Sequence, residues 1–71
     1  MAINYAYIFA CIDLDTNMCI GMETTTDATQ GELAEWVEIP VYDEEYLFKY
    51  YINGNWYEDA EGTIPWTSSL L

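Results

Sequence analysis

Two apolar runs near the N-terminus are too short for typical helices and have the composition of strands. Residues 5–12, YAYIFACI, are apolar at almost every position and rich in aromatic and isoleucine side chains. This run predicts a strand that is covered on both faces. Residues 18–22, MCIGM, predict a second short strand, in which Gly21 is expected to mark a bulge or a close approach of backbone.

The stretch between these runs, DLDTN, resembles the start of a calcium-binding loop. Asp13, Asp15 and Asn17 occupy its first, third and fifth positions. Such a loop also needs glycine at position six and glutamate at position twelve, but these positions hold Met18 and Thr24. Because Asp and Asn also favour turns through local side-chain hydrogen bonds, the stretch is predicted to be a hairpin turn, and no metal site is expected.

The length of that turn fixes which residues of the two strands face each other. A three-residue loop places Cys11 opposite Cys19, and a two-residue loop places Cys11 opposite Ile20. Both registers remain open at this stage. The N-terminal residues do not read as a signal peptide, so folding in a reducing cytoplasm is expected. The two cysteines are therefore expected to be buried thiols and not a disulfide.

The middle of the chain is polar and then alternates. Residues 23–35 predict a loop, in which Asp27 and Gln30 offer a capping box for a single helical turn. Residues 35–42, EWVEIPVY, alternate in polarity and predict a strand. Because Pro40 cannot donate to a strand ladder, this strand is expected at a sheet edge or interrupted at the proline.

The segment that follows carries the strongest local signals in the sequence. Asp43 predicts the N-cap of one short helical turn, with acidic residues in its first turn. Asn53 and Gly54 then lie between two aromatic runs, which predicts a type I′ hairpin. The predicted cross-strand pairs are Ile52 with Asn55, Tyr51 with Trp56, Tyr50 with Tyr57, and Lys49 with Glu58.

These elements predict a mainly β fold: a small antiparallel sheet of four or five strands, built from two hairpins, with at most one short helical turn. The chain of 71 residues is expected to form a single small β domain, residues 1–71, in which residues 62–71 are an extended apolar tail. Such a tail either packs back on the sheet or docks on another molecule. Ser68 and Ser69 are expected in a flexible part of it.

Charge narrows the possible partners. Thirteen acidic residues stand against a single basic residue, Lys49, for a net charge of −12. Direct binding to nucleic acid or to anionic membranes is therefore not expected. This net negative charge is larger than solubility alone requires of a small domain. Solvation by water and binding to a basic partner are both possible explanations of it. The chain has no histidine, and no activated nucleophile is apparent, so neither catalysis nor a cofactor is expected.

The aromatic content suggests where a partner binds. Tyrosine and tryptophan carry both an apolar ring and a polar group, which suits them to interfaces. The predicted partner-binding surface combines the aromatic hairpin with the apolar tail. Its residues are Tyr50, Tyr51, Trp56, Tyr57, Ile64, Trp66, Leu70 and Leu71.

Residues 39–66 resemble small bacteriophage proteins and the ends of phage tail-fibre chains, which carry an Ile-Pro, an acidic turn and a K-x-Y-x-N-G-x-W hairpin. The matching residues are Ile39, Pro40, Asp43, Lys49, Tyr51, Asn53, Gly54 and Trp56. The resemblance implies a non-enzymatic structural or adaptor component of the virion, in the tail, baseplate or fibre. It would be made in the host bacterial cytoplasm and would contact other phage structural proteins or further copies of itself. The alternative is a phage-encoded acidic nucleic-acid mimic that inhibits a host defence nuclease.

Overall fold

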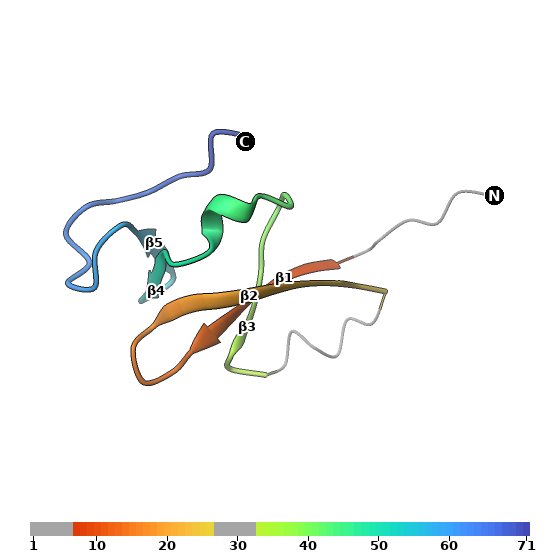
Figure 1. Cartoon of the computed structure of the whole chain (residues 1–71), viewed down its shortest axis with the longest axis horizontal. Coiled ribbons are helices and arrows are strands. Elements are labelled where there is room, and N and C mark those ends of the chain that lie inside the picture. The colour runs from red at the N-terminus through yellow and green to blue at the C-terminus, as the bar shows by residue number, and fades with distance from the viewer. Residues whose placement is uncertain (1–6, 27–32) are drawn as a thin grey trace.

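The chain folds as one antiparallel sheet with a single short helical turn (Figure 1). The computed structural model describes residues 7–26 and 33–71. The elements are β1 (Tyr7–Asp13), β2 (Met18–Thr25), β3 (Trp36–Glu38), the 3-10 turn η2 (Glu44–Tyr46), β4 (Tyr50–Ile52) and β5 (Asn55–Tyr57). The five strands have the order β3-β1-β2-β4-β5. The predicted mainly β, antiparallel architecture is confirmed.

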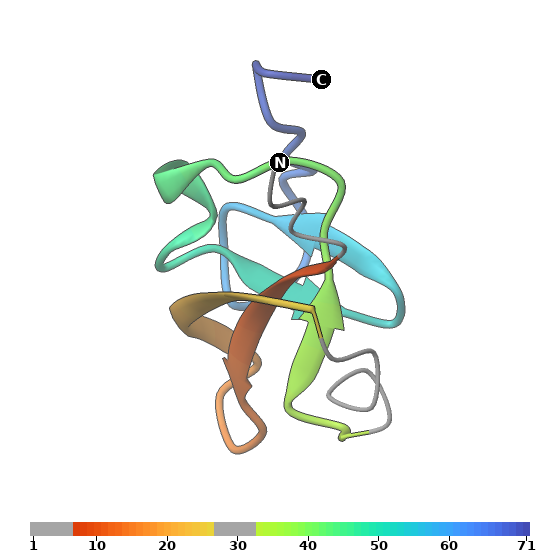
Figure 2. The same ribbon diagram turned by 90° about the vertical axis from the view of Figure 1, so that its right-hand side faces the viewer.

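The two hairpins are neighbours in the sheet, with β2 of the first next to β4 of the second. The long β1–β2 hairpin carries β3 along its outer side, and the short β4–β5 hairpin joins the other side (Figures 1 and 2). After β5 the chain turns back toward η2 (Figure 1). No helix within residues 7–26 and 33–71 has the length and apolar character that a membrane span requires.

The turn between β1 and β2 is held by its own polar side chains. The amide of Asp15 donates to Oδ1 of Asp13 at 3.0 Å, and the amide of Asn17 donates to the carbonyl of Asp13 at 2.6 Å. Asn17 takes a left-handed conformation, with φ of 66°, which asparagine tolerates better than most residues. The prediction of a turn at DLDTN is confirmed.

Next to the turn, this hairpin has the register of the second alternative, but it leaves that register at Cys11. Asp13 pairs with Met18 and Ile12 with Cys19, but the register then shifts and Cys11 pairs with Gly21. Both partners predicted for Cys11 are therefore wrong, because Ile20 is the extra residue of a β-bulge. The bulge expected near Gly21 is confirmed, and a Cβ built on Gly21 would lie 3.9 Å from that of Cys11.

The edge strand β3 is shorter than predicted. It pairs with β1 alone and ends before Pro40, so its position at the sheet edge is confirmed. One further bond, from the amide of Ile39 to the carbonyl of Ile8 at 2.8 Å, extends the contact up to the proline. The strand β2 runs to Thr25, into the segment predicted as a loop. The start of the first predicted strand and the proposed capping box of Asp27 and Gln30 lie outside the described residues.

The second hairpin and the helical turn before it follow local sequence signals. Asn53 and Gly54 have φ of 51° and 85°, as a type I′ turn requires. Three of the four predicted pairs form: Ile52 with Asn55, Tyr51 with Trp56, and Tyr50 with Tyr57. Asp43 caps η2 as predicted, and its Oδ1 accepts from the amide of Glu45 at 2.9 Å.

The predicted pair of Lys49 and Glu58 is wrong. The carbonyl of Lys49 accepts from the amide of Cys19 at 2.8 Å, and the amide of Glu58 donates to the carbonyl of Ile64 at 2.8 Å. The hairpin ladder therefore stops one pair earlier, and each residue bonds to a different segment.

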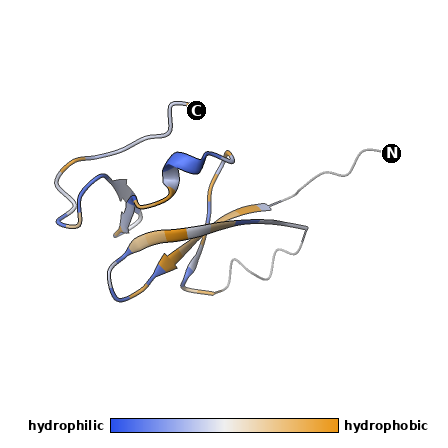
Figure 3. Cartoon of the chain, in the orientation of Figure 1, coloured by the Kyte–Doolittle hydropathy of each residue, from blue (hydrophilic) through white to orange (hydrophobic). Residues whose placement is uncertain are grey.

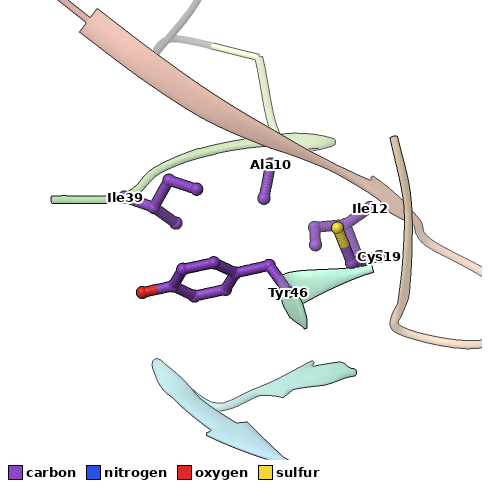
Figure 4. Close-up of a cluster of buried hydrophobic side chains, with 5 residues drawn as sticks. All are labelled: Ala10, Ile12, Cys19, Ile39 and Tyr46. Carbon is purple, nitrogen blue, oxygen red and sulfur yellow. The ribbon is translucent and has the colours of Figure 1, made fainter. Parts of the chain in front are cut away.

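Both faces of β1 are covered, as the composition of the strand predicted. On one face, Ala10, Ile12, Cys19, Ile39 and Tyr46 form the buried cluster shown in Figure 4. Alternation along the strand turns Phe9 to the other face. There it is 1% exposed, with its ring centroid 5.8 Å from that of Trp36. In Figure 3, much of β1 and the adjoining part of β2 are coloured as apolar.

Replacing Phe9 with alanine tests this second face. We expect a loss of about 3–5 kcal/mol in the free energy of unfolding, since a buried aromatic ring is removed. This is comparable to the roughly 3–5 kcal/mol that a core of this size supplies, so the variant should be largely unfolded. Leu14→Ala, at a turn residue that is 57% exposed, is the control and should stay within about 0.5 kcal/mol. Urea denaturation followed by circular dichroism measures both, and similar curves for the two variants would contradict the assignment.

Candidate functional site

Three aromatic rings from separate parts of the chain meet beside the β4–β5 hairpin. Tyr46 comes from η2, Trp56 from β5 and Trp66 from the C-terminal segment. The ring of Tyr46 meets both indoles edge to face, at centroid distances of 4.9 Å to Trp56 and 4.8 Å to Trp66. Such geometry is the preferred one for aromatic pairs. We call these three residues the aromatic cluster.

The C-terminal segment packs back on the hairpin at Pro65 and Trp66, while Leu70 and Leu71 stay exposed. The amide of Trp66 donates to the carbonyl of Trp56 at 3.0 Å, and Pro65 forms an isolated bridge with Tyr57. The side chain of Lys49 lies on the same segment, with Nζ 5.1 Å from the centroid of the Trp66 ring. This cation–π contact replaces the ion pair predicted for Lys49.

The loop that turns the chain back is organised by Asp59. Its carboxylate accepts from the amides of Thr63 and Ile64, each at 2.9 Å, and from the hydroxyl of Thr63. These bonds, led by that of the Thr63 hydroxyl, hold the pKa of Asp59 below its ordinary value. Gly62 has φ of 69° in the same loop, a conformation that favours glycine. The loop thus directs Pro65 and Trp66 onto the hairpin.

A buried hydrogen bond ties the tail to η2. The hydroxyl of Ser68 donates to Oδ2 of Asp43 at 2.5 Å, and both residues are buried. Ser68 also accepts from the amide of Leu70 at 3.1 Å. The expectation that Ser68 lies in a flexible part of the tail is wrong, because Asp43 offers it a buried acceptor. The hydroxyl of Ser68 and then the amide of Glu45 hold the pKa of Asp43 below its ordinary value.

A pocket of about 260 Å³ opens where the aromatic cluster, the hairpin turn and the tail meet. Its lining residues are Pro40, Tyr46, Gly54, Asn55, Trp56, Trp66, Thr67, Ser68 and Leu71. Its walls combine aromatic and aliphatic surface with amide and hydroxyl groups, the mixture typical of sites that bind another molecule. Burial, and secondly the charge of Asp43, raise the pKa of the Tyr46 phenol.

The eight residues predicted to bind a partner fall into three groups, of which the first two share Leu71. Trp56, Trp66 and Leu71 line the pocket. Ile64, Leu70 and Leu71 are the exposed members, at 51%, 60% and 66% of their surface. Tyr50, Tyr51 and Tyr57 are half-buried, and Tyr51 packs on the buried cluster and on Trp56.

The sequence reasoning missed part of the pocket. Tyr46, Pro40 and Ser68 line it but were not proposed as binding residues. The signal for Tyr46 was available, since it is the apolar position in the acidic turn capped by Asp43. No local signal marks Ser68, whose partner Asp43 is 25 positions away.

The thiols and carboxylates are the remaining candidates for site chemistry. Cys11 and Cys19 are free thiols on neighbouring strands, half-buried and buried respectively, and burial raises the pKa of both. Among residues 7–26 and 33–71, no group of three or more Cys, Asp and Glu side chains is arranged to hold a metal ion.

Comparisons of the chain with protein-family models, with curated proteins and with solved structures give no match.

The adjacent serines of the tail provide a matched test of how the site is held. Ser68→Ala removes the bond to Asp43 and should lower the urea midpoint at pH 7, whereas Ser69→Ala, at an exposed position, should stay within about 0.5 kcal/mol of the parent chain.

The stability of the same two variants is expected to depend differently on pH. Because the pKa of Asp43 is lowered from its ordinary 3.8, its ionisation stabilises the folded state above that pH. This stability is lost as the pH falls below 3.8 through the lowered pKa. Ser68→Ala removes the largest cause of the shift, so its acid-dependent loss of stability should be shallower than that of Ser69→Ala. Denaturation series from pH 7 down to about pH 2 measure this. Parallel profiles for the two variants would contradict the role of the bond.

Proposed function

We propose that this chain is a non-enzymatic docking module that attaches to a larger protein assembly through the pocket and the adjoining end of the tail. The observation that carries the proposal is the pocket itself, in which the half-buried Trp56 and Trp66 lie over the buried Tyr46, close to the exposed Leu70 and Leu71. Apolar surface gathered around a recess with polar edges is typical of protein-binding sites.

The pocket is pre-organised, which favours binding. The Asp59 loop and the bond between Ser68 and Asp43 fix the tail on one side, and the aromatic contacts of Tyr46 fix the other. When a partner inserts an apolar side chain into the pocket, little entropy is lost in ordering the site, because the site is already ordered. Leu71 at the rim and the indole of Trp66 would then lose water-exposed apolar surface together.

The setting we propose is the bacteriophage particle, in the tail, baseplate or fibre region. The support is the resemblance of residues 39–66, which includes Trp56 of the pocket wall and Asp43 of its supporting bond. The partners would be other structural proteins of the particle, with further copies of this chain as a second possibility.

The net charge of −12 favours a second candidate, an acidic mimic of nucleic acid that occupies the groove of a host defence nuclease. Such a mimic needs its carboxylates along one face. The exposed acids come from several elements: the β1–β2 turn, β2, the ends of β3, η2 and the loop after β5. The mimic is supported by the net charge alone, whereas the docking module is supported by the pocket. Nuclease binding that weakens steeply with salt would favour the mimic.

Mass spectrometry of purified particles tests the proposal when combined with a double variant of the tail. Leu70→Ser with Leu71→Ser removes exposed apolar surface from the pocket rim without touching Trp66 or Ser68. We expect the parent chain to copurify with particles and the double variant to be at least about tenfold depleted, as for loss of central interface contacts. Ser69→Ala is the matched control and should copurify normally. Absence of the parent chain would contradict the phage setting, and equal recovery of the double variant would contradict docking through the tail.

A further inference from the structure

Phe48 has an unusual backbone conformation for a bulky residue. It lies between η2 and β4 with φ of 70°, and its side chain is 68% exposed. The left-handed region is unfavourable for residues with a Cβ, and a large side chain there is uncommon. Strained residues of this kind persist where the surrounding structure fixes them, and they concentrate at functional positions.

The strain is held by hydrogen bonds on both sides of the residue. The amide of Phe48 donates to the carbonyl of Cys19 at 2.8 Å, and the amide of Cys19 donates to the carbonyl of Lys49 at 2.8 Å. The amide of Lys49 donates to the carbonyl of Tyr46 at 3.0 Å. The backbone at residue 48 is therefore fixed to β2 and to η2 at once, while its ring remains in water.

A second exposed apolar residue lies beside this point. Ile20 follows Cys19 directly, is the extra residue of the β-bulge, and is 57% exposed. The bonds between Cys19 and residues 48 and 49 bring the backbones of Ile20 and Phe48 to neighbouring positions. Each side chain thus comes from a backbone irregularity, one a bulge and the other a left-handed residue. We call the two residues the Phe48–Ile20 patch.

Exposed acidic residues flank the patch along the chain. Glu44 and Glu45 of η2 are exposed on one side of it along the chain. On the other side, β4 begins opposite the acidic β1–β2 turn, with Tyr50 paired to Met18. The single lysine is next to Phe48 in sequence, but its ammonium group lies over the ring of Trp66.

We propose that the Phe48–Ile20 patch is a second docking surface, and that its occupant is a protein surface with an apolar recess bordered by lysine or arginine. An apolar centre with a charged border is the usual anatomy of a protein interface, and the acidic border here requires a basic partner. The net charge of −12 disfavours a second copy of this chain as the occupant. Neither residue of the patch lines the pocket, so this inference is independent of the proposed function.

The strain at Phe48 allows its role in binding to be separated from its role in folding. Phe48→Gly removes the ring and relieves the left-handed conformation, whereas Phe48→Ala removes the ring and keeps the strain. We expect the glycine variant to melt at a higher temperature than the alanine variant, and both to lose binding. If Phe48 served only packing, the glycine and alanine variants would lose stability to the same extent, and relief of the left-handed conformation would make no difference.

The binding probe is a short synthetic peptide that alternates arginine with leucine, and its control alternates arginine with serine. Each is titrated into the isotope-labelled full chain and followed by nuclear magnetic resonance. The leucine peptide should shift the amide signals of Ile20 and Phe48 most, and binding should weaken at least about tenfold with the serine peptide and with Phe48→Gly. Leu33→Ser, at an exposed apolar position near the opposite sheet edge, should bind the leucine peptide as the parent chain does.

Four results would overturn the proposal. Equal binding of the two peptides would show that charge alone acts. Unchanged binding by Phe48→Gly would remove the ring from the interface. Largest shifts at the pocket residues would assign the peptide to the other site. Self-association of the parent chain in sedimentation experiments, lost in Phe48→Gly, would make a second copy the occupant.

Discussion

The edge-on packing of Tyr46 between Trp56 and Trp66 is the interaction on which the rest of the structure depends. Within the sheet, the two hairpins are joined by a single registered pair, Met18 with Tyr50, and a few flanking hydrogen bonds. Tyr46 also belongs to the buried cluster with Ala10 and Ile12 on β1. Each aromatic pair contributes roughly 0.5–1.5 kcal/mol beyond the area that it buries. The cluster therefore joins the two hairpins and holds the tail as well.

Some of the many carboxylates of this chain stabilise its fold by accepting hydrogen bonds from the backbone. Asp13, Asp43 and Asp59 each accept a hydrogen bond from a backbone amide a few residues ahead, and each thereby shapes a turn or a helix start. Such carboxylates accept hydrogen bonds from backbone amides that have no partner in a strand ladder. The other described acids are mostly exposed, where water and salt screen their repulsion.

Turns and caps formed by residues close in sequence were predictable, whereas contacts between distant segments were not. Asn53 with Gly54, and Asp43 as an N-cap, act on residues within a few positions of themselves, so their patterns predict the hairpin and the helical turn. Lys49 had several acidic residues within reach along the sequence, and its contact with Trp66 depends on the return of the tail. Nothing in the residues around Phe48 marks a left-handed conformation, because glycine and asparagine, the usual signals, are absent there.

The same residues hold the fold and line the pocket, so the binding that we propose there would be coupled to folding. Trp66 and Ser68 fix the tail, and both also face the pocket. A partner in the pocket meets a surface that exists only in the folded chain, and by mass action it stabilises that state. A domain of this size has a small core and a large net charge, both of which leave the isolated chain marginal. Attachment to a larger assembly would offset this low stability. The exposed apolar surface at the pocket, which is unfavourable in water, is then compatible with so small a fold.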